Sequence, residues 1–210
     1  MKQWKKVMTL FCLALSLVFV SACGGKAATG NSEKPAAAPA AAKAPARAKK
    51  TLVVYYTNTH RTEQAAKVIA KETGGDLLLL ELEKPYTEAD LDYNNKESRV
   101  SKEHNDPKLR DPALKNGKPA NWKEYDTVFV GYPIWWGIAA WPLDTFVKSN
   151  DFSGKTVIPF ATAYSSGMGD SAGLLKEMAG NKGTWLEGRC FTGTLSDSKI
   201  AEWVSTLGVK

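Results

Sequence analysis

From residue 51 onward, short apolar runs alternate with segments of helical periodicity, and this alternation limits the folds open to the chain. Runs rich in apolar residues begin at Thr51, Leu77, Thr127 and Thr156, and a fifth strand fits within residues 184–191. Strands that are apolar along their length and separated by helices favour a parallel sheet with helices on both faces. The sequence therefore predicts a doubly wound α/β domain with five strands.

Helical segments fill the gaps between these strands. The first, residues 62–73, has apolar residues at helical spacing, Thr62 as a candidate N-cap and two glycines after it as a stop signal. Further helices are expected at residues 142–149, 171–179 and 197–207, the last with an apolar stripe on one face.

A long polar segment, residues 85–125, separates the second and third predicted strands. Connections of this length inside a compact domain are usually functional or disordered. Folded over a binding site, the segment could form a lid, which would favour a small substrate.

The first 50 residues differ in composition from the predicted domain, residues 51–210. Residues 1–22 begin with lysines and continue into an apolar run that is short for a membrane span of about 20 residues but typical of a secretory signal. The run ends in VSAC at Cys23, which resembles a bacterial lipoprotein signal, where the cysteine is lipidated and becomes the new N-terminus. The alternative is an ordinary cleaved signal with an incidental cysteine. Residues 23–50 contain no bulky apolar residue, so we expect a disordered Ala/Pro/Lys tether.

The formal net charge of +6 does not belong to the predicted domain. Residues 1–50 hold nine Lys and Arg and a single Glu, so residues 51–210 are slightly acidic. A basic surface for nucleic acid is therefore not supported, and we expect no nucleic-acid partner. Cys12 would leave with the signal and Cys23 would carry the lipid. Cys190 then has no disulfide partner and is expected to be a small core residue.

Three loops that follow predicted strands would meet at one edge of the sheet. Ligands of open parallel sheets bind there, near the point where the strand order reverses. Residues 57–62 offer hydroxyl groups and free backbone N–H groups before a helix, which suits an anion. Residues 131–142 are rich in tryptophan, and residues 162–170 in hydroxyl groups and glycine. Taken singly, the first is an ordinary Thr-rich turn, but the combination suits a phosphorylated planar ring.

The segments VVYYTNTHRT, GYPIWWG, FSGKTVIPFAT and SSGMGD resemble the flavodoxin-like proteins across essentially all of residues 51–210. The resemblance implies an α/β fold with a five-stranded parallel sheet in the order 2-1-3-4-5, and non-covalently bound FMN where that order reverses. For the FMN phosphate it implies Thr57, Asn58, Thr59, Arg61 and Thr62. For one side of the isoalloxazine ring it implies Pro133, Ile134, Trp135, Trp136 and Gly137. For the other side it implies Thr162, Ala163, Tyr164, Ser165, Ser166 and Gly167.

Two adjacent positions depart from the family pattern, because His60 and Arg61 stand where Gly-Asn is usual. Histidine is among the residues that tolerate a left-handed backbone. Arg61 is expected either to pair with the phosphate or to point into water. His60 and His104 are too few for a metal cluster, and no nucleophile elbow accompanies them. We therefore expect no catalytic side chain and no metal, with both histidines at the surface or in loops.

Trp135 and Trp136 are neighbours, and in an extended backbone their side chains point in opposite directions. We expect one indole to lie near the ring and the other to pack against the domain, with Trp135 as the ring-side residue. Trp141 is expected in the core. The alternative is that both members of the pair are ordinary core aromatics.

Two functional hypotheses from different classes follow. The first is an FMN-dependent redox protein, anchored through a lipid on Cys23 to a bacterial membrane outside the cytoplasm, with an unknown redox partner. It includes both an electron carrier and a reductase of quinone-like acceptors. The second is a flavin-free binding or scaffold lipoprotein, because a fold alone does not determine function. Uptake of FMN by the purified protein separates the two.

Overall fold

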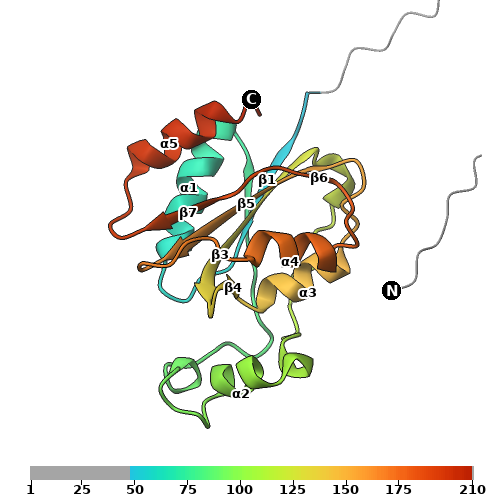
Figure 1. Ribbon diagram of the computed structural model, residues 1–210. Helices are drawn as coiled ribbons and strands as arrows, with labels where there is room; N and C mark the ends of the chain where they lie inside the picture. The colour runs from blue at the N-terminus through green and yellow to red at the C-terminus, as the bar shows by residue number, and fades with distance from the viewer. Residues whose placement is uncertain (1–47, 210) are drawn as a thin grey trace, which may run out of the picture. The chain divides into compact units, whose positions relative to one another are not determined.

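The computed structural model describes residues 48–209 (Figure 1). The predicted signal, Cys23 and the tether up to residue 47 lie outside the described residues. The last tether residue, Lys50, already belongs to the fold. Its carbonyl accepts hydrogen bonds from the N–H groups of Asp126 and Thr127, and its ammonium group pairs with Asp76 and Glu124.

The main sheet consists of five strands in the order β2-β1-β3-β5-β6, and each strand is parallel to its neighbours. These strands are β1 (Thr51–Tyr55), β2 (Asp76–Leu79), β3 (Thr127–Trp135), β5 (Thr156–Ala163) and β6 (Thr184–Trp185). Two short strands complete the sheet: β4 (Ile138–Ala139) is antiparallel to β3, and β7 (Arg189–Thr192) is parallel to β5. Strand β4 is only the return arm of a hairpin with β3, so β5 and β6 are the fourth and fifth strands of the parallel sheet. The predicted order 2-1-3-4-5 is therefore confirmed. The predicted fifth strand is split into β6 and β7.

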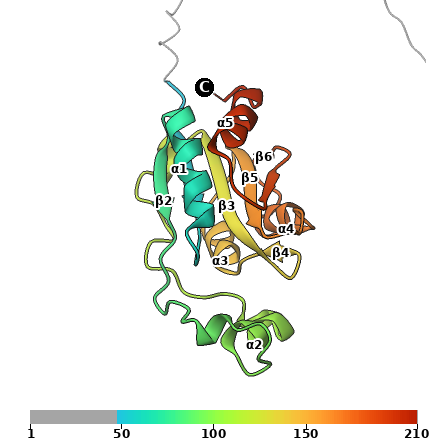
Figure 2. The same cartoon turned by 90° about the vertical axis from the view of Figure 1, so that its left-hand side faces the viewer.

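Helices cover both faces of the sheet (Figures 1 and 2). One face carries α1 (Arg61–Thr73) and α5 (Asp197–Thr206), and the other carries α3 (Pro142–Ser149) and α4 (Ser171–Met178). Each pair of helices closes a separate hydrophobic cluster over the sheet. No helix within residues 48–209 is long and apolar enough to cross a membrane.

The ends of α1 are set by two residues with left-handed backbones. Gly74 ends the helix with φ 64°, as the glycine pair predicts. The prediction of Thr62 as the N-cap is wrong, since His60 occupies that position with φ 62° and Thr62 lies inside the first turn, buried. The expected tolerance of His60 for a left-handed backbone is thus confirmed.

Strand β2 departs from the prediction of an apolar strand covered on both faces. It is the edge strand, ends at Leu79 instead of residue 82, and leaves Leu77 and Leu79 exposed. The buried leucines, Leu80 and Leu82, lie just beyond it. The first part of the apolar run, up to Leu79, therefore forms the edge strand. The leucines after it are buried in the core, just before the insertion begins.

The part of the polar insertion around α2 (Arg99–Asn105) lies beyond the carboxyl ends of the strands (Figures 1 and 2). The end of the insertion returns to the amino ends of β3 and β5, where Lys155 Nζ donates to the Trp122 carbonyl. The insertion contains one α-helix, α2, with Ser98 as its N-cap, and three short 3-10 turns: η1 (Ala89–Leu91), η2 (Pro107–Leu109) and η3 (Trp122–Glu124). Inside the insertion, the Tyr86 hydroxyl donates to the buried carboxylate of Glu103 at 2.6 Å, and Arg99 Nε donates to the same carboxylate at 2.8 Å. These contacts join α2 to the start of the insertion.

Candidate functional site

The β1–α1 loop presents the positive end of a helix. The first bond of the helical ladder runs from the Gln64 N–H to the His60 carbonyl at 3.0 Å. The N–H groups of the residues between them, the first turn of α1, therefore have no partner inside the helix. Together with the helix dipole they form a site that favours an anion.

Thr62 lies below this loop and does not face the solvent. Its hydroxyl shares a buried hydrogen bond with the hydroxyl of Thr162, at 2.9 Å between the oxygens. Thr162 is near the end of β5, so the bond joins the first and third predicted loops. Of the predicted phosphate residues, Thr57 and Asn58 are half-buried and Thr59 is exposed.

Arg61 is half-buried and has a partner within the domain. Its guanidinium group donates to the Gly193 carbonyl, and the Gly193 N–H donates to the Tyr164 carbonyl at 3.1 Å. Arg61 therefore links the β1–α1 loop, through Gly193, to the loop after β5.

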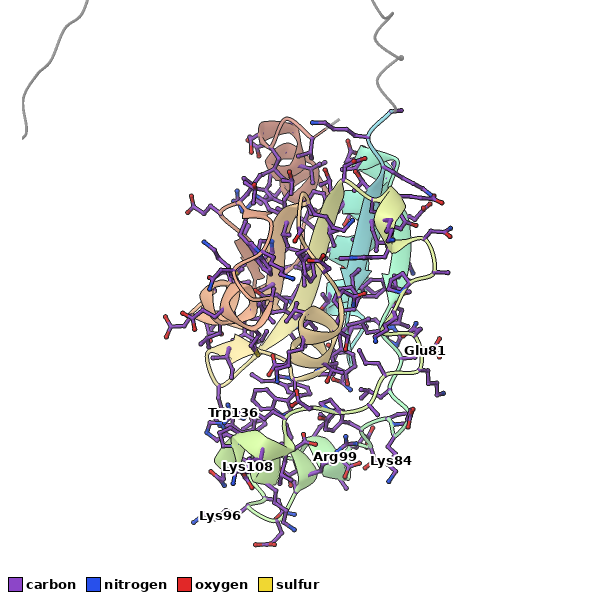
Figure 3. The ribbon with its side chains drawn as sticks, turned by 90° about the vertical axis from the view of Figure 1, so that its right-hand side faces the viewer. Glu81, Lys84, Lys96, Arg99, Lys108 and Trp136 are labelled. Atoms are coloured by element: carbon purple, nitrogen blue, oxygen red, sulfur yellow. The ribbon has the colours of Figure 1, made fainter. Side chains whose placement is uncertain are left out.

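The tryptophan-rich segment is a hairpin. Strand β3 runs on to Trp135, which pairs with Ile138 of β4, and the turn between them consists of Trp136 and Gly137. Both turn residues have positive φ, 47° and 80°. Such turns favour Asn-Gly, and a bulky non-glycine residue in this conformation is an outlier that costs roughly 1–3 kcal/mol. The strained position raises the indole of Trp136 at the tip of the hairpin, beside α2 (Figure 3).

The two neighbouring indoles have different surroundings. Trp135 meets the rings of Tyr56, Tyr86 and Trp141 edge-on, with centroids 6.1, 5.4 and 5.4 Å away. Trp136 is 42% exposed and lies parallel to the imidazole of His104, with centroids 4.4 Å apart. The pair thus divides between a packed and an exposed position. Trp141 is fully buried, as predicted.

A cavity of about 380 Å³ lies at this edge of the sheet, within the size range of small-molecule sites. It brings together predicted residues of the first and second loops: Asn58, Thr59, Pro133, Ile134, Trp135 and Trp136. The third predicted loop does not line it. There Ala163 is buried, the residues from Tyr164 to Gly167 are exposed, and Tyr164 reaches 90% exposure.

The insertion supplies a wall of the cavity that the sequence did not identify residue by residue. Leu91 at the end of η1, Tyr93 after it and Val100 on α2 all line the cavity. The one indication of this wall in the sequence was the unusual length of the insertion. His104, expected in a loop or at the surface, is instead half-buried on α2 against Trp136.

One polar atom at this cavity lacks a partner. The side-chain oxygen Oδ1 of Asn58 is buried and accepts no hydrogen bond from residues 48–209. Beside it, burial raises the pKa of Tyr56 to about 12, and a hydrogen bond with the Asn58 side chain opposes that rise. A buried acceptor without a donor is costly, so the site suits a ligand that donates a hydrogen bond to Asn58.

The third loop contacts the hairpin directly. A side-chain carbon added at Gly169 would lie 2.1 Å from the carbonyl oxygen of Gly137. Only glycine allows this approach, which keeps the loop after β5 against the hairpin turn.

A doubly wound sheet with this strand order, and a cavity at the carboxyl ends of its strands, defines a flavodoxin-type α/β protein. The flavodoxin family model matches residues 50–207, and the chain belongs to this family. No curated protein matches the chain.

Solved structures are similar over the same region. A candidate flavoprotein from Bacteroides eggerthii is 44% identical, with a TM-score of 0.70 over 78% of this chain and 100% of that one. Another, from Bacteroides uniformis, is 40% identical, with a TM-score of 0.69 over 75% of this chain and 98% of that one. A flavoprotein from Lactobacillus acidophilus in complex with FMN is 20% identical, with a TM-score of 0.55 over 74% and 99%. This last likeness concerns the fold.

Proposed function

We propose that this flavodoxin binds FMN non-covalently and acts as a redox protein, passing electrons to a partner or to a small quinone-like acceptor. The observation that carries the proposal is the juxtaposition, at one edge of the sheet, of a helix N-terminus with an aromatic-walled cavity. Asn58 lies between them and lines the cavity with its neighbour Thr59.

The residues present fit the three parts of FMN. The free N–H groups at the start of α1 suit the phosphate. The unpartnered Oδ1 of Asn58 suits a donor, which the ribityl hydroxyl groups supply. The apolar walls from the hairpin and the insertion suit a planar ring.

One acidic residue near the phosphate position needs compensation. Glu63 lies in the first turn of α1, where its charge would repel a phosphate. Its carboxylate pairs with Lys67 at 2.6 Å and with the His60 ring at 2.7 Å. The hydrogen bonds from Lys67 and His60 lower the pKa of Glu63, and the Lys67 ammonium group balances its charge.

When bound, FMN supplies the electron-transfer chemistry. The protein's own residues would bind and orient it: the first turn of α1 would hold the phosphate, and Asn58 Oδ1 would accept a hydrogen bond. The hairpin and the insertion would face the ring with apolar side chains. The apolar insertion wall, with Tyr93 71% exposed, favours an uncharged planar acceptor over a charged one.

The test is titration of the purified apo-protein with FMN and with riboflavin, followed by flavin fluorescence. We expect FMN to bind at least ten-fold more tightly, because each hydrogen bond to the charged phosphate contributes about 1.5–3 kcal/mol. Equal affinities would rule out a phosphate site at α1. If neither flavin binds, the flavin-free scaffold becomes the better description.

The same proposal includes attachment to a membrane outside the cytoplasm through a lipid on Cys23. Its support is the short apolar segment before VSAC and the tether composition. A Cys23→Ala variant should leave the membrane fraction and change its mobility on a gel. An unchanged distribution and mobility would refute the lipid anchor.

A further inference from the structure

Trp136 is held in its strained turn by contacts that come from outside the hairpin. Its indole lies parallel to His104, with planes 9° apart, and parallel to Trp141, with planes 13° apart and centroids 6.3 Å apart. Trp141 is fixed in the core, whereas His104 belongs to the insertion. The conformation of Trp136 therefore depends on where α2 lies.

Helix α2 is itself anchored at its carboxyl end. Arg110 donates from Nε to the Glu103 carbonyl at 2.8 Å and from its guanidinium to the His104 carbonyl. The same guanidinium lies 4.8 Å from the centre of the Trp141 ring. Arg110 thus joins the last turn of α2 to the core tryptophan.

The same face of α2 also reaches the cavity. Val100, which lines the cavity, lies one helical turn before His104, and residues four apart share a helix face. Trp136 lines the same cavity from the hairpin. The stack of His104 on Trp136 therefore joins the insertion wall of the cavity to the hairpin wall.

We propose that His104 is a positioning residue that acts through Trp136. Its imidazole holds the indole at the tip of the hairpin and thereby sets the distance between the hairpin wall and the insertion wall. The effect of His104 on binding of the FMN ring rests on the proposed function. The position of Trp136 in the apo-protein does not depend on it.

The variants are His104→Ala, which removes the ring, and His104→Phe, which keeps a flat ring. Asn105→Ala, at an exposed neighbouring position on α2, is the matched control. The chain has seven tryptophans, so the signal of Trp136 is isolated as the difference from a Trp136→Ala variant.

In the apo-protein, His104→Ala should increase acrylamide quenching of the Trp136 signal about two-fold or more, because one face of the indole loses its cover. It should also weaken FMN binding by about 3- to 10-fold, the size expected for one aromatic pair. His104→Phe should restore both properties, and Asn105→Ala should change neither. In the Trp136→Ala background, His104→Ala should have no further effect on FMN binding.

Several results would overturn the positioning role. These are unchanged quenching in His104→Ala, an equal loss of FMN affinity in the Trp136→Ala background, or a gain of affinity, which would mean that His104 competes with the ligand for the indole. If the parent protein binds no FMN, the proposed function fails, while the quenching comparison still decides the role of His104. If His104→Ala does not fold, the same comparison between the parent and a His104→Gln variant replaces it.

Discussion

Asp144, in the first turn of α3, carries a carboxyl group that is almost completely buried. Burial raises the pKa of Asp144 from 3.8 to about 7; Lys148 and Arg110 oppose the rise and Asp111 adds to it. Because the folded pKa lies above the unfolded one, this group destabilises the fold as pH rises from about 4 to about 7. The loss is complete above that range.

The Asp144→Asn substitution removes the charge and keeps the shape. Each unit of pKa shift corresponds to about 1.4 kcal/mol, so the ionised carboxylate costs at most about 4 kcal/mol above pH 7. We expect about half of that ceiling, since the effective dielectric of buried sites exceeds that of a dry interior. A gain of about 2 kcal/mol corresponds to a rise in Tm of roughly 4–8 °C for a domain of this size.

The assay is thermal unfolding followed by circular dichroism at pH 5 and pH 8. The stabilisation should be large at pH 8 and small at pH 5, where the native carboxyl group is already protonated. Glu177→Gln, at an exposed position on α4, is the control and should change Tm little at either pH. Destabilisation at pH 8 would mean that Asp144 works as an ion-pair partner of Arg110 or Lys148. A gain that does not vary with pH would mean that ionisation of the buried carboxyl group is not its cause.

Three further predictions concern the site and the strand beneath it. Thr59→Ala should weaken FMN binding by roughly ten-fold and leave riboflavin binding unchanged; titration with both flavins tests this, and equal losses would contradict a phosphate contact. Trp135→Ala should lower the free energy of unfolding by roughly 2 kcal/mol or more, because it removes a ring packed on three others, whereas Trp136→Ala should change it little. Denaturant unfolding and FMN titration of both variants test this, and undiminished FMN affinity in both would mean that neither tryptophan contacts the flavin. Gly131→Ala should destabilise by about 1–3 kcal/mol, since the new carbon would lie 2.1 Å from the ring of the fully buried Phe160; an unchanged Tm would show that the Phe160 ring moves aside freely.

Predicted residues of the first two loops line one cavity, but the sequence did not identify all of its walls. Residues of the first two loops meet at one cavity because the carboxyl ends of parallel strands share an edge, a rule that needs only the order of the elements. The contribution of Leu91, Tyr93 and Val100 was not predictable, because the path of a long polar insertion has no periodic signal. The inward position of the Thr62 hydroxyl was also missed, since its partner Thr162 is distant in sequence.

The sequence by itself determined the five main strands, the helices α1, α3, α4 and α5, and their order, because apolar periodicity acts over a few neighbouring positions. It also marked His60 as a residue able to take a left-handed backbone. Only the tertiary structure decided that the leucines of β2 are exposed, that Arg61 bonds to Gly193, and that His104 stacks on Trp136. Each of these depends on groups brought together from distant parts of the chain. Their energies come from packing and hydrogen bonds formed only after the sheet has assembled, so no local pattern records them.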